Sequence, residues 1–149
     1  MTLGTITRKV FCDTSFFYAS LDKNDRDHVA ARAMANWLKD KSIAVITTWE
    51  IVVETVTLLR YRLSFHGAEV FIRSVLPQLN IIYIADDERS KALESFLKLS
   101  KDKKLSLCDL ISYAVVKMHF PGIPCFAFDD DFRQMGLTVL SEPPTSSGR

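Results

Sequence analysis

Short runs of apolar residues that stop at hydroxyl or carboxyl side chains alternate with longer segments of helical period along this chain. Continuous apolar runs are typical of strands in a parallel sheet that is covered on both faces. The pattern therefore predicts strands at residues 9–12, 42–46, 80–84 and 124–128, with a fifth at 137–140.

The segments between these runs have the period of amphipathic helices. Helices are predicted over residues 25–39, 49–63, 65–76, 92–99 and 106–118. In the first of them the predicted apolar stripe is Val29, Ala33, Trp37 and Leu38.

Strands that alternate with helices favour βαβ units with right-handed crossovers. We expect an α/β fold with three α/β/α layers around a central, mainly parallel sheet of four to five strands. One domain is expected over residues 1–140, followed by a flexible tail at 141–149 that is rich in Pro, Ser and Gly.

The composition agrees with such a domain, since 48% of the 149 residues are hydrophobic. No apolar run approaches the roughly 20 residues of a membrane-spanning helix, and the first nine residues lack the layout of a signal peptide. We therefore expect a cytoplasmic protein with no membrane partner. The three cysteines form no metal-binding pair, so we expect buried free thiols at Cys12, Cys108 and Cys125.

Acidic residues stand where the predicted strands and helices meet. Asp13 and Asp129 end the first and fourth strands, and Asp131 follows closely. Glu54 lies in the helix after the second strand, and Asp109 lies in the first turn of the helix that Ser106 opens. In parallel α/β sheets, ligands bind beyond the carboxyl ends of the strands. We therefore expect these five acids to converge at one edge of the sheet.

Carboxylates gathered in this way repel one another unless a cation lies between them. Hard ions such as Mg²⁺ and Mn²⁺ prefer oxygen ligands. One or two such ions could activate a water and stabilise an in-line phosphoryl displacement. The sequence thus predicts a metal site formed by Asp13, Glu54, Asp109 and Asp129, with Asp131 beside it.

Each acid also has a simpler interpretation. Asp13 could cap a helix, and Asp109 could be the N3 residue of a capping box opened by Ser106. Glu54 could be a solvated position, and residues 129–131 could be an acidic turn. Glu50, four residues before Glu54, lies on the same helical face, and the residues alone do not choose between the two.

The motifs around these acids resemble those of PIN-domain nucleases. The first is Val10-Phe11-Cys12-Asp13-Thr14-Ser15-Phe16, and the second is Thr47-Thr48 followed by Glu54-Thr55-Val56-Thr57-Leu58-Leu59-Arg60. The third is Leu105-Ser106-Leu107-Cys108-Asp109, and the fourth is Phe126-Ala127-Phe128-Asp129-Asp130-Asp131-Phe132-Arg133. The four stand in the family's order over about residues 9 to 140. The alignment selects Glu54 over Glu50.

The resemblance implies a single-domain ribonuclease that uses Mg²⁺ or Mn²⁺, often as a homodimer, like the VapC-type toxins of toxin–antitoxin pairs. By this resemblance Asp13, Glu54, Asp109 and Asp129 are catalytic metal ligands and Asp131 is an accessory acid. An antitoxin partner is implied, although the motifs do not show one. The alternative is a PIN-like module that binds RNA or protein without catalysis.

The RNA substrate would approach by its phosphates, guided by basic side chains at the rim. Arg60 and Arg133 are the expected contacts, with Arg62, Lys103 and Lys104 as further candidates. The hydroxyls of Thr14 and Ser15 could contact the substrate or only cap the helix.

Taken alone, the net charge of +1 disfavours a nucleic-acid partner, but it is the sum over the predicted site acids and the rest of the chain. Without the five predicted site acids, the chain has 19 basic and 13 acidic residues and a net charge of +6. Near-neutrality is therefore consistent with an acidic metal site in a modestly basic protein.

Overall fold

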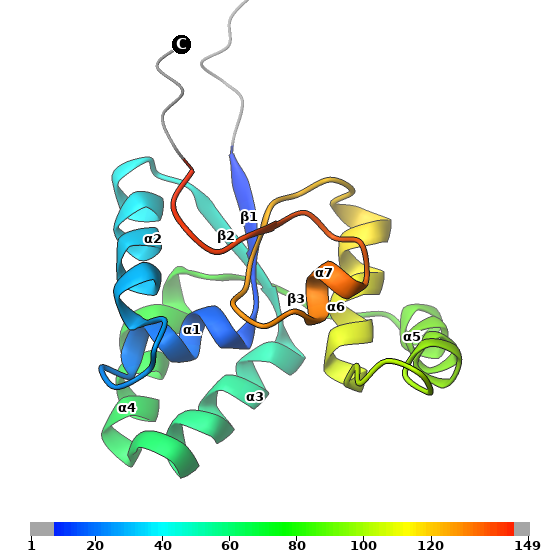
Figure 1. Cartoon of the computed structure of the whole chain (residues 1–149), viewed down its shortest axis with the longest axis horizontal. Helices are drawn as coiled ribbons and strands as arrows, with labels where there is room; N and C mark the ends of the chain where they lie inside the picture. Colours follow the sequence, from blue (N-terminus) through cyan, green and yellow to red (C-terminus); the bar gives the residue numbers. More distant parts are fainter. Residues whose placement is uncertain (1–7, 145–149) are drawn as a thin grey trace, which may run out of the picture.

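Five parallel strands form one sheet in the computed structural model, which describes residues 8–144. The order across the sheet is β3-β2-β1-β4-β5 (Figure 1). The strands are β1 (Lys9–Cys12), β2 (Ala44–Thr48), β3 (Asn80–Ile82), β4 (Cys125–Phe126) and β5 (Val139–Leu140). The predicted α/β fold with a mainly parallel sheet is confirmed, and all four pairings between these strands are parallel.

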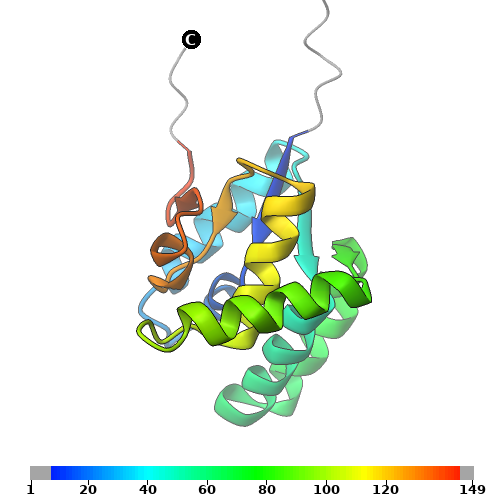
Figure 2. The ribbon, with the colours of Figure 1, turned by 90° about the vertical axis from the view of Figure 1, so that its right-hand side faces the viewer.

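Helices cover both faces of this sheet. They are α1 (Thr14–Leu21), α2 (His28–Asp40), α3 (Trp49–Leu58), α4 (Phe65–Val70), α5 (Asp86–Leu99), α6 (Leu107–His119) and α7 (Asp131–Gln134). The π-helical segment η1 (Leu59–Leu63) continues α3, and α4 continues into η2 (Phe71–Val75) and η3 (Leu76–Gln78). Helices α1, α2 and α4 lie on one side of the sheet, and α5 and α6 lie on the other (Figures 1 and 2).

Aromatic side chains fill the layer between the sheet and α1 and α2. Phe126 of β4 is fully buried, and its ring centroid lies 5.5 Å from that of Phe16 and 6.2 Å from that of Trp37. Phe11 on the neighbouring strand packs against Phe132 of α7 at 6.1 Å. Burying a large apolar side chain stabilises a fold by about 2 kcal/mol, so this cluster fixes the central strands on which the acidic edge depends.

The second strand ends two residues later than the sequence predicts. Thr47 and Thr48 belong to β2 and are fully buried. Burial is tolerated because both hydroxyls have partners: that of Thr47 donates to the carbonyl of Cys12 at 2.8 Å, and that of Thr48 accepts from the amide of Ile51 at 3.1 Å. Thr48 is thereby the N-cap of α3.

The predicted apolar stripe of α2 is half correct. Leu38 is buried and Trp37 packs against the core, whereas Val29 is 82% exposed and Ala33 is exposed. Ala31 and Met34 form the buried face together with Leu38. The helix turns this i, i+3, i+7 stripe to the core. The third and fourth strands are shorter than predicted, and α5 begins at Asp86, before Ala92, the first residue of the predicted apolar stripe.

Strand register brings three strand ends to the same level. Phe11 of β1 pairs with Ile46 of β2 on one side and with Cys125 of β4 on the other. Asp13, Thr48 and Ala127 therefore lie side by side at the carboxyl edge. Residues 145–149 of the predicted tail lie outside the described residues. No helix in residues 8–144 is long and apolar enough to cross a membrane.

Candidate active site

Asp13 is placed by the junction between β1 and α1. It is the N-cap of α1, and its Oδ2 accepts from the amide of Ser15 at 3.3 Å and from the Ser15 hydroxyl at 2.8 Å. The residue is only 3% exposed. Capping is therefore a real role of Asp13, and it uses one carboxylate oxygen, Oδ2.

Glu54 is held by the residue that follows Asp13. The Thr14 hydroxyl donates to Oε1 of Glu54 at 2.6 Å and accepts from the Thr55 hydroxyl at 3.4 Å. Glu50 does not line the same pocket, and its buried Oε1 has no hydrogen-bond partner among the described residues. Of the two glutamates, Glu54 is thus the one that lies with Asp13.

Asp109 enters from the other face of the sheet, at the start of α6. It is the N3 residue of a capping box: its Oδ2 accepts from the amide of Ser106 at 2.9 Å, and its amide donates to the Ser106 hydroxyl at 3.0 Å. The residue is 7% exposed. As with Asp13, this capping role uses one carboxylate oxygen, Oδ2.

Asp129 and Asp131 follow β4. The amide of Asp131 donates to Oδ1 of Asp129 at 3.2 Å, and α7 begins at Asp131. Just before them, the amide of Phe128 donates to the Ser15 hydroxyl at 3.0 Å. Ser15 thus links this loop directly to Asp13, since the same hydroxyl donates to the Asp13 carboxylate.

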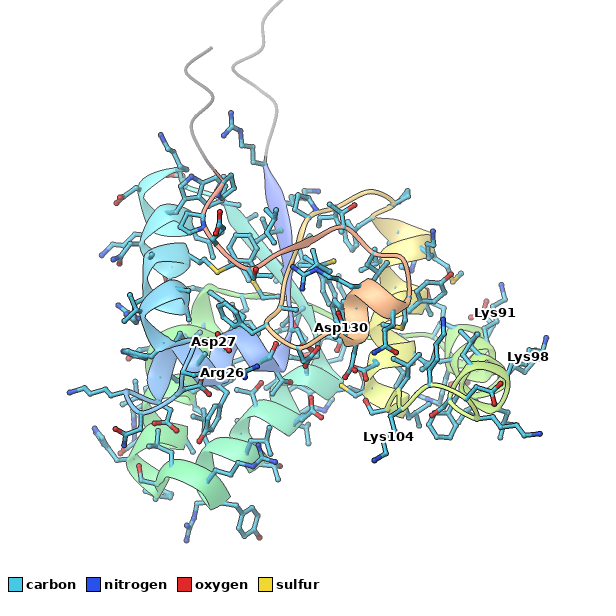
Figure 3. The ribbon with its side chains drawn as sticks, viewed as in Figure 1. Arg26, Asp27, Lys91, Lys98, Lys104 and Asp130 are labelled. Atoms are coloured by element: carbon cyan, nitrogen blue, oxygen red, sulfur yellow. The ribbon has the colours of Figure 1, made fainter. Side chains whose placement is uncertain are left out.

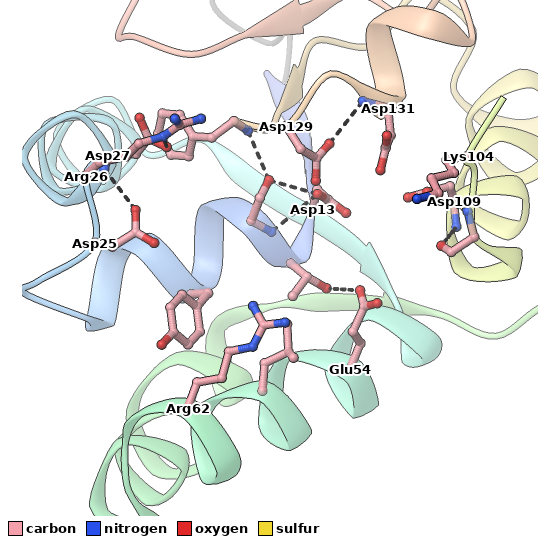
Figure 4. Close-up of a pocket in the computed structure, with 16 residues that line it drawn as sticks. Asp13, Asp25, Arg26, Asp27, Glu54, Arg62, Lys104, Asp109, Asp129 and Asp131 are labelled. Carbon is pink, nitrogen blue, oxygen red and sulfur yellow. Dashed lines mark hydrogen bonds and ion pairs between the residues drawn. The ribbon is translucent and has the colours of Figure 1, made fainter.

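All five predicted acids line one pocket of about 480 Å³ (Figure 4). The other lining residues are Thr14, Ser15, Tyr18, Asp25, Arg26, Asp27, Leu58, Arg62, Lys104, Ser106 and Phe128. As the side chains stand in residues 8–144, no three His, Cys, Asp or Glu side chains are close enough to enclose an ion. A bound cation would therefore have to draw the carboxylates together.

Burial and mutual repulsion make these acids hard to ionise. Burial, together with the charge of Asp129, raises the pKa of Asp13 to about 8. Burial and the charges of Asp109 and Asp129 raise the pKa of Asp131 to about 7. The pKa of Asp129 is raised as well, because surrounding protein displaces water from it and Asp109 lies nearby. The pocket thus has an excess of negative charge, which either protons or cations can offset.

The expected substrate contacts are arranged differently from the prediction. Thr14 and Ser15 line the pocket, but their hydroxyls are already engaged with Glu54 and Asp13. Arg60 and Arg133 do not line it. Arg60 lies in a separate apolar groove with Val56, Phe65 and Ile72.

Arg62 and Lys104 line the pocket instead, and Arg26 and Tyr18 join them without having been predicted. Residues two apart on a helix point to nearly opposite sides, so only one of Arg60 and Arg62 can face the acids. The helical period shows that Arg60 and Arg62 point to different sides, but the sequence does not show which side faces the acids.

The cysteines are mostly as expected. Cys12 and Cys125 are buried, whereas Cys108 is only half-buried and lies near the acids. Burial, followed by the charges of Glu54 and Asp13, raises the pKa of the Cys108 thiol strongly. It is therefore an un-ionised thiol at neutral pH.

The donor set suits a hard divalent ion. It consists of carboxylates alone, which is the ligand type that Mg²⁺ and Mn²⁺ prefer. Each of four carboxylates accepts a hydrogen bond from the protein through one of its oxygens; they are Asp13, Glu54, Asp109 and Asp129. Such bonds orient ligating carboxylates in metal sites.

Comparison with known proteins identifies the domain. Residues 10–137 match the family model of the PIN domain. The search of curated protein sequences gives no match. Among solved structures, VapC20 of Mycobacterium tuberculosis, a toxin that cleaves the sarcin–ricin loop, is 28% identical with a TM-score of 0.73; the alignment covers 91% of this chain and 99% of that one.

Two further solved structures share the fold at lower identity. VapBC2 of Rickettsia felis, bound to a promoter DNA fragment, is 12% identical with a TM-score of 0.63, covering 89% of this chain and 97% of that one. FitAcB of Neisseria gonorrhoeae is 17% identical with a TM-score of 0.62, covering 88% and 96%.

Proposed function

The chain belongs to the PIN-domain family, and on that premise we propose that it is a metal-dependent endoribonuclease, the toxin of a toxin–antitoxin pair. The observation that carries the proposal is the set of five carboxylates, from both faces of the sheet, that line one pocket at its carboxyl edge. A structural role alone does not account for acids with raised pKa values gathered in a single pocket.

Asp13, Asp109 and Asp129 are proposed to hold a Mg²⁺ or Mn²⁺ ion, with Glu54 completing the shell and Asp131 supporting a second ion. Such ions stabilise the negative charge of a phosphoryl displacement and make water a better nucleophile at neutral pH. The protein's part is to bring these carboxylates to one pocket and to orient them. Thr14 orients Glu54, and Ser15 orients Asp13 and the loop before Asp129.

The test is cleavage of RNA by the purified chain. Ribosomes are a suitable first substrate because the M. tuberculosis relative at 28% identity cleaves the sarcin–ricin loop. We expect cleavage with Mg²⁺ or Mn²⁺, none with EDTA, and a loss of at least about 100-fold for Asp13→Asn and Asp109→Asn. Undiminished cleavage by those folded variants would refute the assignment.

The alternative is a PIN-like module that binds RNA or protein without cutting. The presence of all four motif acids favours the enzyme. If the wild-type chain binds RNA but cleaves none with any divalent metal, the chain is a binding module.

An antitoxin partner, a homodimer and a cytoplasmic location are further parts of the proposal. Co-expression with the product of a small neighbouring gene, followed by purification of a complex, tests the partner.

A further inference from the structure

The acidic pocket has cationic side chains on two opposite walls. Arg62 enters from η1 on the side of Glu54, and Lys104 enters from the loop that leads into α6, beside Asp109 (Figure 4). The two come from segments on different sides of the sheet. A polymer that passed from one to the other would have to cross the acids.

Arg62 and Lys104 are the cations of this pocket that remain available. Within residues 8–144 neither forms an ion pair, whereas Arg26, the third basic residue of the lining, lies 3.5 Å from Asp27. Both side chains are exposed. An unpaired cation beside a row of acids attracts an anionic ligand that the acids alone would repel.

Neighbouring basic residues are directed elsewhere. Lys103, next to Lys104, donates through Nζ to the carbonyl of Gln134 at 3.3 Å and does not line the pocket. Lys91 and Lys98 lie on α5, away from the acids (Figure 3). Arg60 lies in the apolar groove beyond α3. The placement of Arg62 and Lys104 is therefore selective rather than a general consequence of a basic surface.

We infer that Arg62 and Lys104 bind the phosphates on either side of the scissile one, so that single-stranded RNA crosses the pocket between them. This inference rests on the proposed nuclease function and adds the path of the substrate to it. Arg62 presents a planar guanidinium that can hold two phosphate oxygens, and Lys104 presents a point charge.

The test compares Arg62→Gln and Lys104→Gln with Arg60→Gln and Lys103→Gln. The matched controls remove the same charges two residues and one residue away. Binding of a fluorescein-labelled 20-nucleotide single-stranded RNA is followed by anisotropy at several KCl concentrations. EDTA is present throughout, so that no cleavage is expected and the RNA stays intact.

Each pocket variant is expected to lose about three- to tenfold in affinity at low salt, and the slope of log K against log salt is expected to fall by about 0.7. The controls are expected to change affinity by less than about twofold, with an unchanged slope. If the pocket variants match the controls while the wild-type chain cleaves RNA, the inference is wrong and the proposed function stands. If the wild-type chain neither binds nor cleaves RNA, both fall.

Discussion

At the scale of single residues, two consecutive hydroxyls organise the acids. Thr14, the residue after Asp13, donates to Glu54 on α3, and Ser15 connects Asp13 to the amide of Phe128 before Asp129. The sequence suggested substrate contacts or helix caps for these hydroxyls, because it shows neither the distance to Glu54 nor the partner amide. Contacts between residues 15 and 128, 113 positions apart, depend on the tertiary fold.

The link through Ser15 gives a direct prediction. Ser15→Ala leaves the Phe128 amide without its acceptor and removes the hydroxyl that donates to Asp13. We expect the Mn²⁺ concentration for half-maximal RNA cleavage to rise about tenfold or more. Ser20→Ala is the control, since Ser20 lies on the same helix and donates to the carbonyl of Phe17 at 2.7 Å, away from the acids. Equal manganese requirements for the two variants would contradict this role.

The pKa of Asp13 predicts how stability depends on pH without metal. The folded chain raises this pKa from 3.8 to about 8, so the folded state holds the proton more tightly than the unfolded state. The stabilisation is therefore complete below about pH 4 and is lost as pH rises toward 8. We expect the melting temperature in EDTA to fall between about pH 5 and 8.

Added Mn²⁺ should reverse that loss at the upper end of the range, because a cation replaces the proton. Asp13→Asn, which cannot ionise, should show a shallower fall in EDTA than the wild-type chain. A melting temperature that does not change from pH 5 to 8 in EDTA would contradict the raised pKa of Asp13 in the folded chain. Equal slopes for the two proteins would contradict it as well.

At the scale of elements, the sequence is sufficient to predict that strands and helices alternate. It is not sufficient to predict which side of each helix faces the sheet. Continuous apolar runs were sufficient to predict β1 to β5 in order. On α2, however, Val29 was predicted to be part of the buried stripe and is exposed. Val29 and Met34 are both apolar, and only the position of the sheet decides which one is covered. The same ambiguity separates Arg60 from Arg62.

The observed face of α2 can be tested by truncation. Met34 is fully buried and Val29 is 82% exposed. We expect Met34→Ala to lower the free energy of unfolding by about 2–5 kcal/mol and Val29→Ala to change it by less than about 0.5 kcal/mol. Urea denaturation followed by circular dichroism gives both values. A larger loss for Val29→Ala than for Met34→Ala would mean that the side of α2 that carries Val29 faces the core.

At the scale of the whole molecule, the net charge of +1 conceals a division of charge. Seven acidic and three basic side chains line the pocket, so the remainder of the protein is basic. The convergence of the five acids was predictable, because parallel strands present their carboxyl ends at one edge. The positions of Arg62 and Lys104 in the pocket were not predictable, because they depend on the orientation of η1 and of the loop before α6.

The central claim is that this pocket is a divalent-cation centre. Anomalous diffraction from crystals of the full chain grown with Mn²⁺ tests it most directly. We predict a manganese peak within coordination distance of Asp13, Asp109 and Asp129, and no peak there in crystals of Asp109→Asn. Saturating Mn²⁺ that left the pocket without a peak, or placed manganese only at other sites, would contradict the account.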